Sequence, residues 1–142
     1  MYTKLINIDR KDIDKEVLKE AADIIRGGGL VAFPTETVYG LGADAFNKDA
    51  AKKIYGAKKR PPDNPLIVHI ADIDELEKIV SEVTEDARRL MERFWPGPMT
   101  LILKKKEGIP LETTAGLDTV AVRMPEDEVA REFIRLCKTP IA

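Results

Sequence analysis

The sequence predicts a single domain in which helices flank a β-sheet, an architecture of the α/β type. The chain has 142 residues, close to the size of one typical domain. Strand-like and helix-like segments alternate along it, and residues 30–33 and 66–70 are apolar runs of the kind found in strands covered on both faces. Alternation alone favours a purely parallel sheet.

Composition excludes several classes of protein. There are 23 basic and 25 acidic side chains, so the net charge of -2 argues against a polycation that coats nucleic acid. A single cysteine, Cys137, forms no intramolecular disulfide, which is typical of a cytoplasmic protein. Residues 1–10 lack the apolar core of a signal peptide, and no apolar run is long enough to span a membrane. One histidine and one cysteine exclude the usual zinc site, and we expect no protein-bound metal.

The first elements follow from local signals. Residues 2–8 contain Leu5 and Ile6 in a polar run and are expected to form a short strand. Asp14 is expected to cap a helix over residues 15–26, where apolar residues recur at helical spacing. Glycines at 27–29 end that helix, and a strand follows.

The later segments continue the alternation, and two of the expected helices have recognisable caps. Asp72 and Glu75 match a capping box for a helix through Val80, and Thr84 is placed to cap a helix through Phe94. The other expected elements are a helix at 49–58, a polar turn at 60–65, a strand at 66–70, a turn at 95–98, strands at 99–103 and 119–124, and a helix at 126–138.

Residues 139–142 read as the opening of another strand. A buried strand needs neighbours and a polar exit, so we expect residues 1–142 to form one domain that is incomplete at its C-terminus. The resulting sheet edge favours self-association.

No phosphate loop of the G-x-x-x-x-G-K-[ST] type occurs, and Gly40-Leu41-Gly42 lacks the third glycine of a dinucleotide fingerprint. Residues 34–43, PTETVYGLGA, directly follow a predicted strand, where α/β proteins place ligands. Composition alone favours a simple Thr/Gly-rich connection there.

Basic residues occur in two clusters. Lys58 and Arg60 precede a proline-stiffened turn and suit phosphate oxygens, although a solvated helix end explains them equally well. The residues 104–106 are three lysines, which we interpret as solvated surface.

Two polar residues lie in apolar strands. A lone histidine in an apolar strand, such as His69, is more often a hydrogen-bonded core or edge residue than a catalytic group. A guanidinium at Arg123 is costly to bury unless an anion meets it, and either a protein carboxylate or an anionic ligand would serve.

Five motifs occur in a fixed order: Gly28-Gly29 before a strand, PTETVYGLGA from Pro34, the K-x-R of Lys58 and Arg60 followed by RPPDNPLIVHI, WPGPMT from Trp95, and TAGLDTVAVRMP from Thr114. Together they resemble the YrdC-type threonylcarbamoyl-AMP synthases over nearly the whole chain. The resemblance implies an α+β fold of the YrdC/RibB-like kind, a three-layer domain with a twisted sheet of mixed parallel and antiparallel strands flanked by helices. It also implies that L-threonine, bicarbonate and ATP give threonylcarbamoyl-AMP and pyrophosphate. Other tRNA-modification proteins would pass the product to the adenosine beside the anticodon.

The resemblance also implies roles for particular residues. It assigns L-threonine binding to Thr37, His69 and Arg123. It assigns ATP binding to Lys58, Arg60, Asn64 and Thr119. Lys58 and Arg60, with a Mg²⁺ ion that accompanies ATP, would be catalytic by stabilising negative charge on the phosphates.

The family's Ser-x-Asn motif, which follows the strand beginning at Pro140, is absent from this chain. We therefore expect the 142-residue polypeptide to be nearly inactive by itself. Two alternatives remain open. One is a non-catalytic module that binds double-stranded RNA or tRNA through phosphates. The other is the carbamoyl-transfer domain of a hydrogenase maturation factor, which shares the fold.

Overall fold

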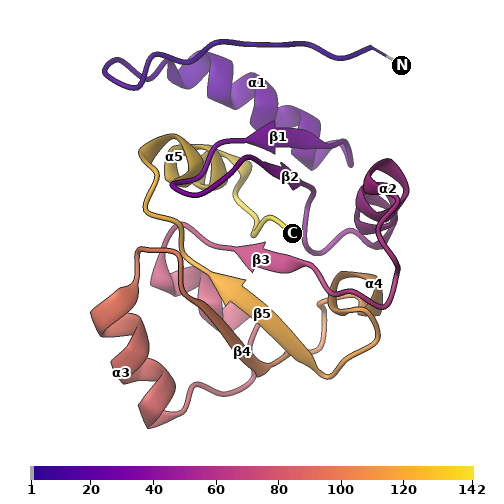
Figure 1. Ribbon diagram of the computed structural model, residues 1–142, viewed down its shortest axis with the longest axis vertical. Coiled ribbons are helices and arrows are strands. Elements are labelled where there is room, and N and C mark those ends of the chain that lie inside the picture. The colour runs from indigo at the N-terminus through magenta and orange to yellow at the C-terminus, as the bar shows by residue number, and fades with distance from the viewer. Residues whose placement is uncertain (1) are drawn as a thin grey trace.

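The computed structural model describes residues 2–142 and combines helices with two small sheets (Figure 1). In chain order the elements are α1 (Lys15–Arg26), β1 (Val31–Phe33), β2 (Gly40–Gly42), α2 (Lys48–Lys58), β3 (Ile67–His69), the 3₁₀-helix η1 (Ile73–Lys78), α3 (Glu85–Phe94), β4 (Thr100–Lys104), α4 (Leu111–Thr114), β5 (Thr119–Arg123) and α5 (Glu128–Cys137). β1 pairs with β2 antiparallel, while β5 lies between a parallel β3 and an antiparallel β4. The mixed α+β architecture is thus confirmed, and the purely parallel sheet suggested by alternation is wrong.

The last residues of the chain connect the two sheets. Ile141 exchanges backbone hydrogen bonds of 2.7 and 3.0 Å with His69. Ala142 exchanges bonds of 2.8 and 3.1 Å with Ala43 on its other side. Residues 140–142 therefore form an extended segment with β3 on one side and residues 43–45, which follow β2, on the other. Figure 1 shows the C-terminus at this place. Pairing with neighbouring backbone, as predicted for the start of a strand, is thus found for residues 140–142, as isolated bridges at Ile141, while Thr139 lies in a bend.

Two hydrophobic clusters hold the elements together. One lies on the inner face of the larger sheet, where Val68, Val120 and Val122 pack with apolar residues of α2, η1 and α3. The other joins α1 and α5 to Phe33 and Ile141. The chain end is therefore part of a core as well as of the sheet.

Most of the predicted helix boundaries are confirmed. The Asp14 carboxylate accepts bonds from the first-turn N–H groups of α1, and the Thr84 hydroxyl accepts one from Ala87. Gly28 has φ +83°, a left-handed conformation that favours glycine after a helix.

The expected strand at residues 2–8 is wrong, because this segment has no strand partner and Leu5 is 89% exposed. The strands at 30–33 and 66–70 are each covered on one face, since Ala32 and Ile67 are exposed. These short strands alternate between a buried and an exposed face.

The capping box at Asp72 is also wrong. The Asp72 carboxylate accepts two bonds, of 2.9 and 3.0 Å, from Arg135 and makes no cap bond to η1. The Glu75 carboxylate instead accepts a bond from the N–H of Ala71. A bidentate guanidinium is a stronger partner than a helix N–H group, and the short helix is accordingly 3₁₀.

The cysteine thiol offers a direct test of this packing. Cys137 is buried, and burial raises the pKa of its thiol to about 12. We expect a thiol reagent at pH 8 to label the folded protein very slowly and the protein in denaturant rapidly, with Cys137→Ser unlabelled in both. Rapid labelling of the folded protein would contradict this placement of α5.

Candidate functional site

One face of the larger sheet is open to solvent, and its residues follow from the strand register. Paired residues on neighbouring strands project from the same face of a sheet. The face opposite the buried valines therefore carries Ile67, His69, Thr100, Ile102, Lys104, Thr119, Ala121 and Arg123. Ile102 is 70% exposed, so this surface, the open face, is accessible to a ligand. Five of its residues are polar, in two groups at opposite ends of β5.

Arg123 lies at the C-terminal end of β5 and is almost completely buried. Its Nε donates to the Gly97 carbonyl at 3.2 Å, and one terminal nitrogen donates to the Thr37 hydroxyl at 3.4 Å. The other terminal nitrogen forms an ion pair with the Glu36 carboxylate. Burial lowers the pKa of Arg123. Of the two anions considered for this arginine, the protein carboxylate is present.

His69 stands next to Arg123, because the two residues are register partners in the parallel pair β3–β5. The Phe33 ring meets the imidazole edge-on, with ring centroids 5.7 Å apart. The Nδ1 atom lies 3.2 Å from the Ile67 carbonyl oxygen. Thr37, His69 and Arg123, which the resemblance assigned to one ligand, are thus brought together at one end of the open face.

Stability should depend on pH through His69. Burial lowers the pKa of this group from its ordinary 6.5, so the folded state binds a proton less readily than the unfolded state. We expect the free energy of unfolding to fall as the pH drops below about 6.5 and through the lower folded pKa. Urea unfolding between pH 5 and 7.5 measures this, and His69→Gln should flatten the profile. Equal pH dependence in both proteins would contradict it.

The second polar group, Lys104 and Thr119, lies at the opposite end of the open face. The turn after α2 leads into β3 at this end. Arg60 donates from Nε to the Asn64 carbonyl at 3.1 Å and from a terminal nitrogen to the Pro65 carbonyl at 2.7 Å. This guanidinium therefore ties the turn closed just before β3. Lys58 is the exposed last residue of α2.

Thr119 begins β5 at this same end. Ile67 pairs with Ala121, so the start of β3 and the turn before it lie beside the start of β5. Thr119 and Arg123 are four residues apart on one strand, which corresponds to about 13 Å. Of the residues assigned to ATP, Thr119 thus lies on the open face, and the turn that contains Arg60 and Asn64 leads into β3 at the same end. The residues assigned to threonine lie at the other end.

Near these groups, Glu36 was not singled out from the sequence, whereas Lys104 belongs to the lysine run that was interpreted as solvated surface. Glu36 pairs with Arg123, and the signal for it was a carboxylate in the Thr-rich segment at 34–43. Lys104 faces the open face as the register partner of Thr119, 3.8 Å from a Glu82 carboxylate oxygen. Its side chain is 72% exposed, as expected for solvated surface. Its two neighbours in the lysine run are tied to the carbonyls of Ile109 and Glu77.

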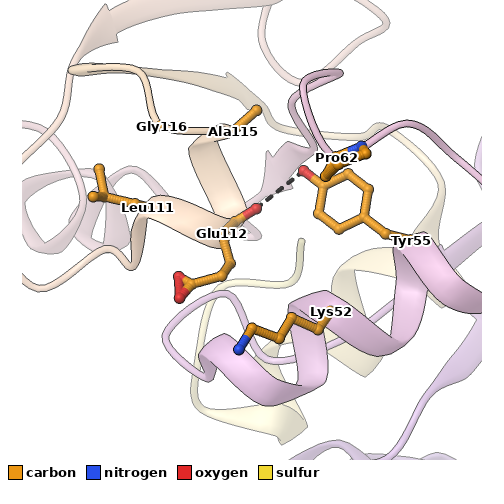
Figure 2. Close-up of a pocket in the computed structure, with 7 residues that line it drawn as sticks. All are labelled: Lys52, Tyr55, Pro62, Leu111, Glu112, Ala115 and Gly116. Carbon is orange, nitrogen blue, oxygen red and sulfur yellow. Dashed lines mark hydrogen bonds between the residues drawn. The ribbon is translucent and has the colours of Figure 1, made fainter.

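A separate hollow of about 320 Å³ lies between α2 and α4, and Figure 2 shows its lining. Its residues are Lys52, Tyr55, Pro62, Leu111, Glu112, Ala115 and Gly116. The Tyr55 hydroxyl donates to the Glu112 carbonyl at 3.0 Å across it. The hollow contains none of the seven residues assigned to threonine or ATP. In residues 2–142 no group of three or more His, Cys, Asp or Glu side chains is placed to hold a metal ion, and no helix is long and apolar enough to cross a membrane.

The mixed sheet flanked by helices is the architecture expected of a YrdC-like domain. The model of the Sua5/YciO/YrdC family, described as "Telomere recombination", matches residues 23–142, and the chain belongs to this family.

Individual members of this family show which of its proteins the chain is similar to. The chain is 54% identical to the threonylcarbamoyl-AMP synthase of Pyrococcus abyssi over 140 residues, which cover 99% of this chain and 41% of that protein. It is 56% identical to the Bacillus subtilis enzyme of the same name, over 88% of this chain and 36% of that protein. The crystal structure of P. abyssi Sua5 complexed with L-threonine superposes with a TM-score of 0.96 at 54% identity, covering 99% of this chain and 41% of that one. The chain thus spans about two fifths of the length of these relatives.

Proposed function

We propose that this chain carries the L-threonine and ATP sites of a threonylcarbamoyl-AMP synthase that acts in the cytoplasm. The reaction joins L-threonine, bicarbonate and ATP into threonylcarbamoyl-AMP and releases pyrophosphate, and tRNA-modification proteins then use the product. The observation that carries the proposal is the grouping of Thr37, His69 and Arg123 at one end of the open face. A relative at 54% identity has been crystallised with L-threonine, which supports this assignment.

At the threonine end, the Arg123 guanidinium would bind the substrate carboxylate, since its fork suits two carboxylate oxygens. The Thr37 hydroxyl and the His69 imidazole would hold the remaining polar groups of the substrate. The bound ammonium group must lose a proton before its amine can attack bicarbonate, and the carbamate forms with loss of water. A carbamate oxygen would then attack the α-phosphorus of ATP, from which pyrophosphate leaves.

At the ATP end, Lys58 and Arg60 would stabilise the negative charge that develops on the phosphates as pyrophosphate leaves. Asn64 and Thr119 would position the nucleotide. These four residues offer no carboxylate, so Mg²⁺ would be held mainly by the phosphate oxygens of ATP. Catalysis would consist of positioning and charge stabilisation, without a covalent intermediate on the protein.

Pyrophosphate release tests this proposal. The assay uses a version of the protein that also carries the Ser-x-Asn segment. With ATP and bicarbonate present, we expect release to require L-threonine. L-serine should be about tenfold or more less effective, because it lacks the methyl group that an apolar pocket would bind. Equal release with and without an amino acid would exclude the synthase and favour a binding module.

A further inference from the structure

Glu36 forms an ion pair with Arg123, the residue proposed to bind the substrate carboxylate. One Glu36 oxygen accepts a bond from Arg123, and the other accepts one from the backbone N–H of Glu126. The arginine side chain is 10% exposed and the glutamate side chain 21% exposed. The positive charge of Arg123 is therefore already balanced by a carboxylate.

Such a pair suits a zwitterion better than a simple anion. A free amino acid carries a carboxylate and an ammonium group on the same carbon, so a carboxylate bound to Arg123 brings the ammonium close to that arginine's neighbours. Each oxygen of an ionised carboxylate accepts more than one hydrogen bond, so Glu36 retains acceptor capacity while it holds Arg123. Every charge would then lie beside one of opposite sign.

We propose that Glu36 is a specificity-determining residue that accepts the ammonium group of the amino acid whose carboxylate Arg123 binds. This inference rests on the proposed function, because it takes L-threonine as the ligand. A second consequence of this role is repulsion between carboxylates. A ligand with a carboxylate but no amine would bring its negative charge near Glu36 without a positive charge to offset it. The pair thus selects amino acids over simple carboxylates.

The test compares L-threonine with (R)-3-hydroxybutanoate, which keeps the carboxylate, hydroxyl and methyl groups and lacks the amine. Calorimetric titration of the whole protein gives the affinity for each. Glu36→Gln should weaken L-threonine binding about tenfold or more, as expected for the loss of a hydrogen bond between charged groups. It should leave binding of the deaminated ligand unchanged or strengthen it. Glu36→Asp, which keeps the charge, should retain the preference for threonine.

Glu92 is exposed on α3 and provides the matched control. Glu92→Gln removes the same charge and should alter neither affinity. If Glu36→Gln weakens both ligands by the same factor, Glu36 only holds Arg123 in place and the inference is wrong. Wild-type protein that binds both ligands equally well would also overturn it. Wild-type protein that binds neither would overturn the proposed function itself.

Discussion

In a version of the protein that also carries the Ser-x-Asn segment, replacing Arg60 with alanine is expected to reduce threonine-dependent pyrophosphate release by about two to three orders of magnitude. Loss of a group that stabilises developing negative charge typically has an effect of that size. The structure adds a second contribution, because the same guanidinium holds the carbonyls of Asn64 and Pro65. Without these bonds the turn before β3 would lose its fixed geometry, and with it the position of any phosphate bound there.

Two further variants separate charge from geometry. Arg60→Lys keeps the positive charge but replaces the planar fork by a single ammonium, so it should restore only part of the activity. Lys106→Ala removes a cation from an exposed side chain that donates a hydrogen bond to the Glu77 carbonyl, and it should retain nearly full activity. Similar losses in Arg60→Ala and Lys106→Ala would show that the wrong basic cluster was chosen.

Much of the fold could be predicted because its signals are local. Asp14 and Thr84 cap the helices that their positions indicated, since a capping side chain bonds N–H groups only two or three residues away. Asp72 has an equally good local pattern, but its partner, Arg135, lies 63 residues further along the chain. The placement of β5 between β3 and β4 is likewise non-local, which is why the mixed sheet followed from the resemblance and not from alternation.

Two other errors in the predicted secondary structure have local causes. β2 is a Gly-Leu-Gly segment, and glycine is depleted in strands, so its sequence reads as a turn. In the fold both glycines lie against the Phe33 ring, and a Cβ atom added at Gly42 would clash with that ring. The strand at residues 2–8 was predicted from one pair of adjacent apolar residues, which cannot both face a core.

The candidate site depended on information that spacing does not contain. His69 and Arg123 are 54 positions apart in the sequence and become neighbours only through the β3–β5 register. From the residues alone, a buried Arg123 requires an anion beside it. That requirement does not say whether the anion is a protein carboxylate or a ligand, nor which carboxylate it is. Glu36 lies in the segment that follows a predicted strand, so a search for a carboxylate there would have found it.

Ile141 should contribute strongly to stability, although it lies one residue from the end of the sequence. Its side chain is fully buried against Gly42, in the same hydrophobic cluster as Phe33. Its backbone exchanges two hydrogen bonds with His69 of β3. We expect Ile141→Ala to lower the free energy of unfolding by about 2–4 kcal/mol, the usual range for an isoleucine truncated in a core. Urea unfolding measures the change, and Ile73→Ala provides the matched control, because Ile73 is 51% exposed. Equal losses in the two variants would contradict the central position of the chain end.

A double variant tests the packing around this residue directly. A Cβ atom added at Gly42 would lie 2.6 Å from Ile141 Cγ2 and 2.8 Å from Phe33 Cε1, so Gly42→Ala should also be destabilising. Truncating Ile141 removes the first of these clashes. Gly42→Ala should therefore lower the free energy of unfolding less in the Ile141→Ala protein than in the wild type. Strictly additive losses would mean that a methyl group at position 42 does not meet the Ile141 side chain. Residues 140–142 would then not lie between β3 and the residues that follow β2.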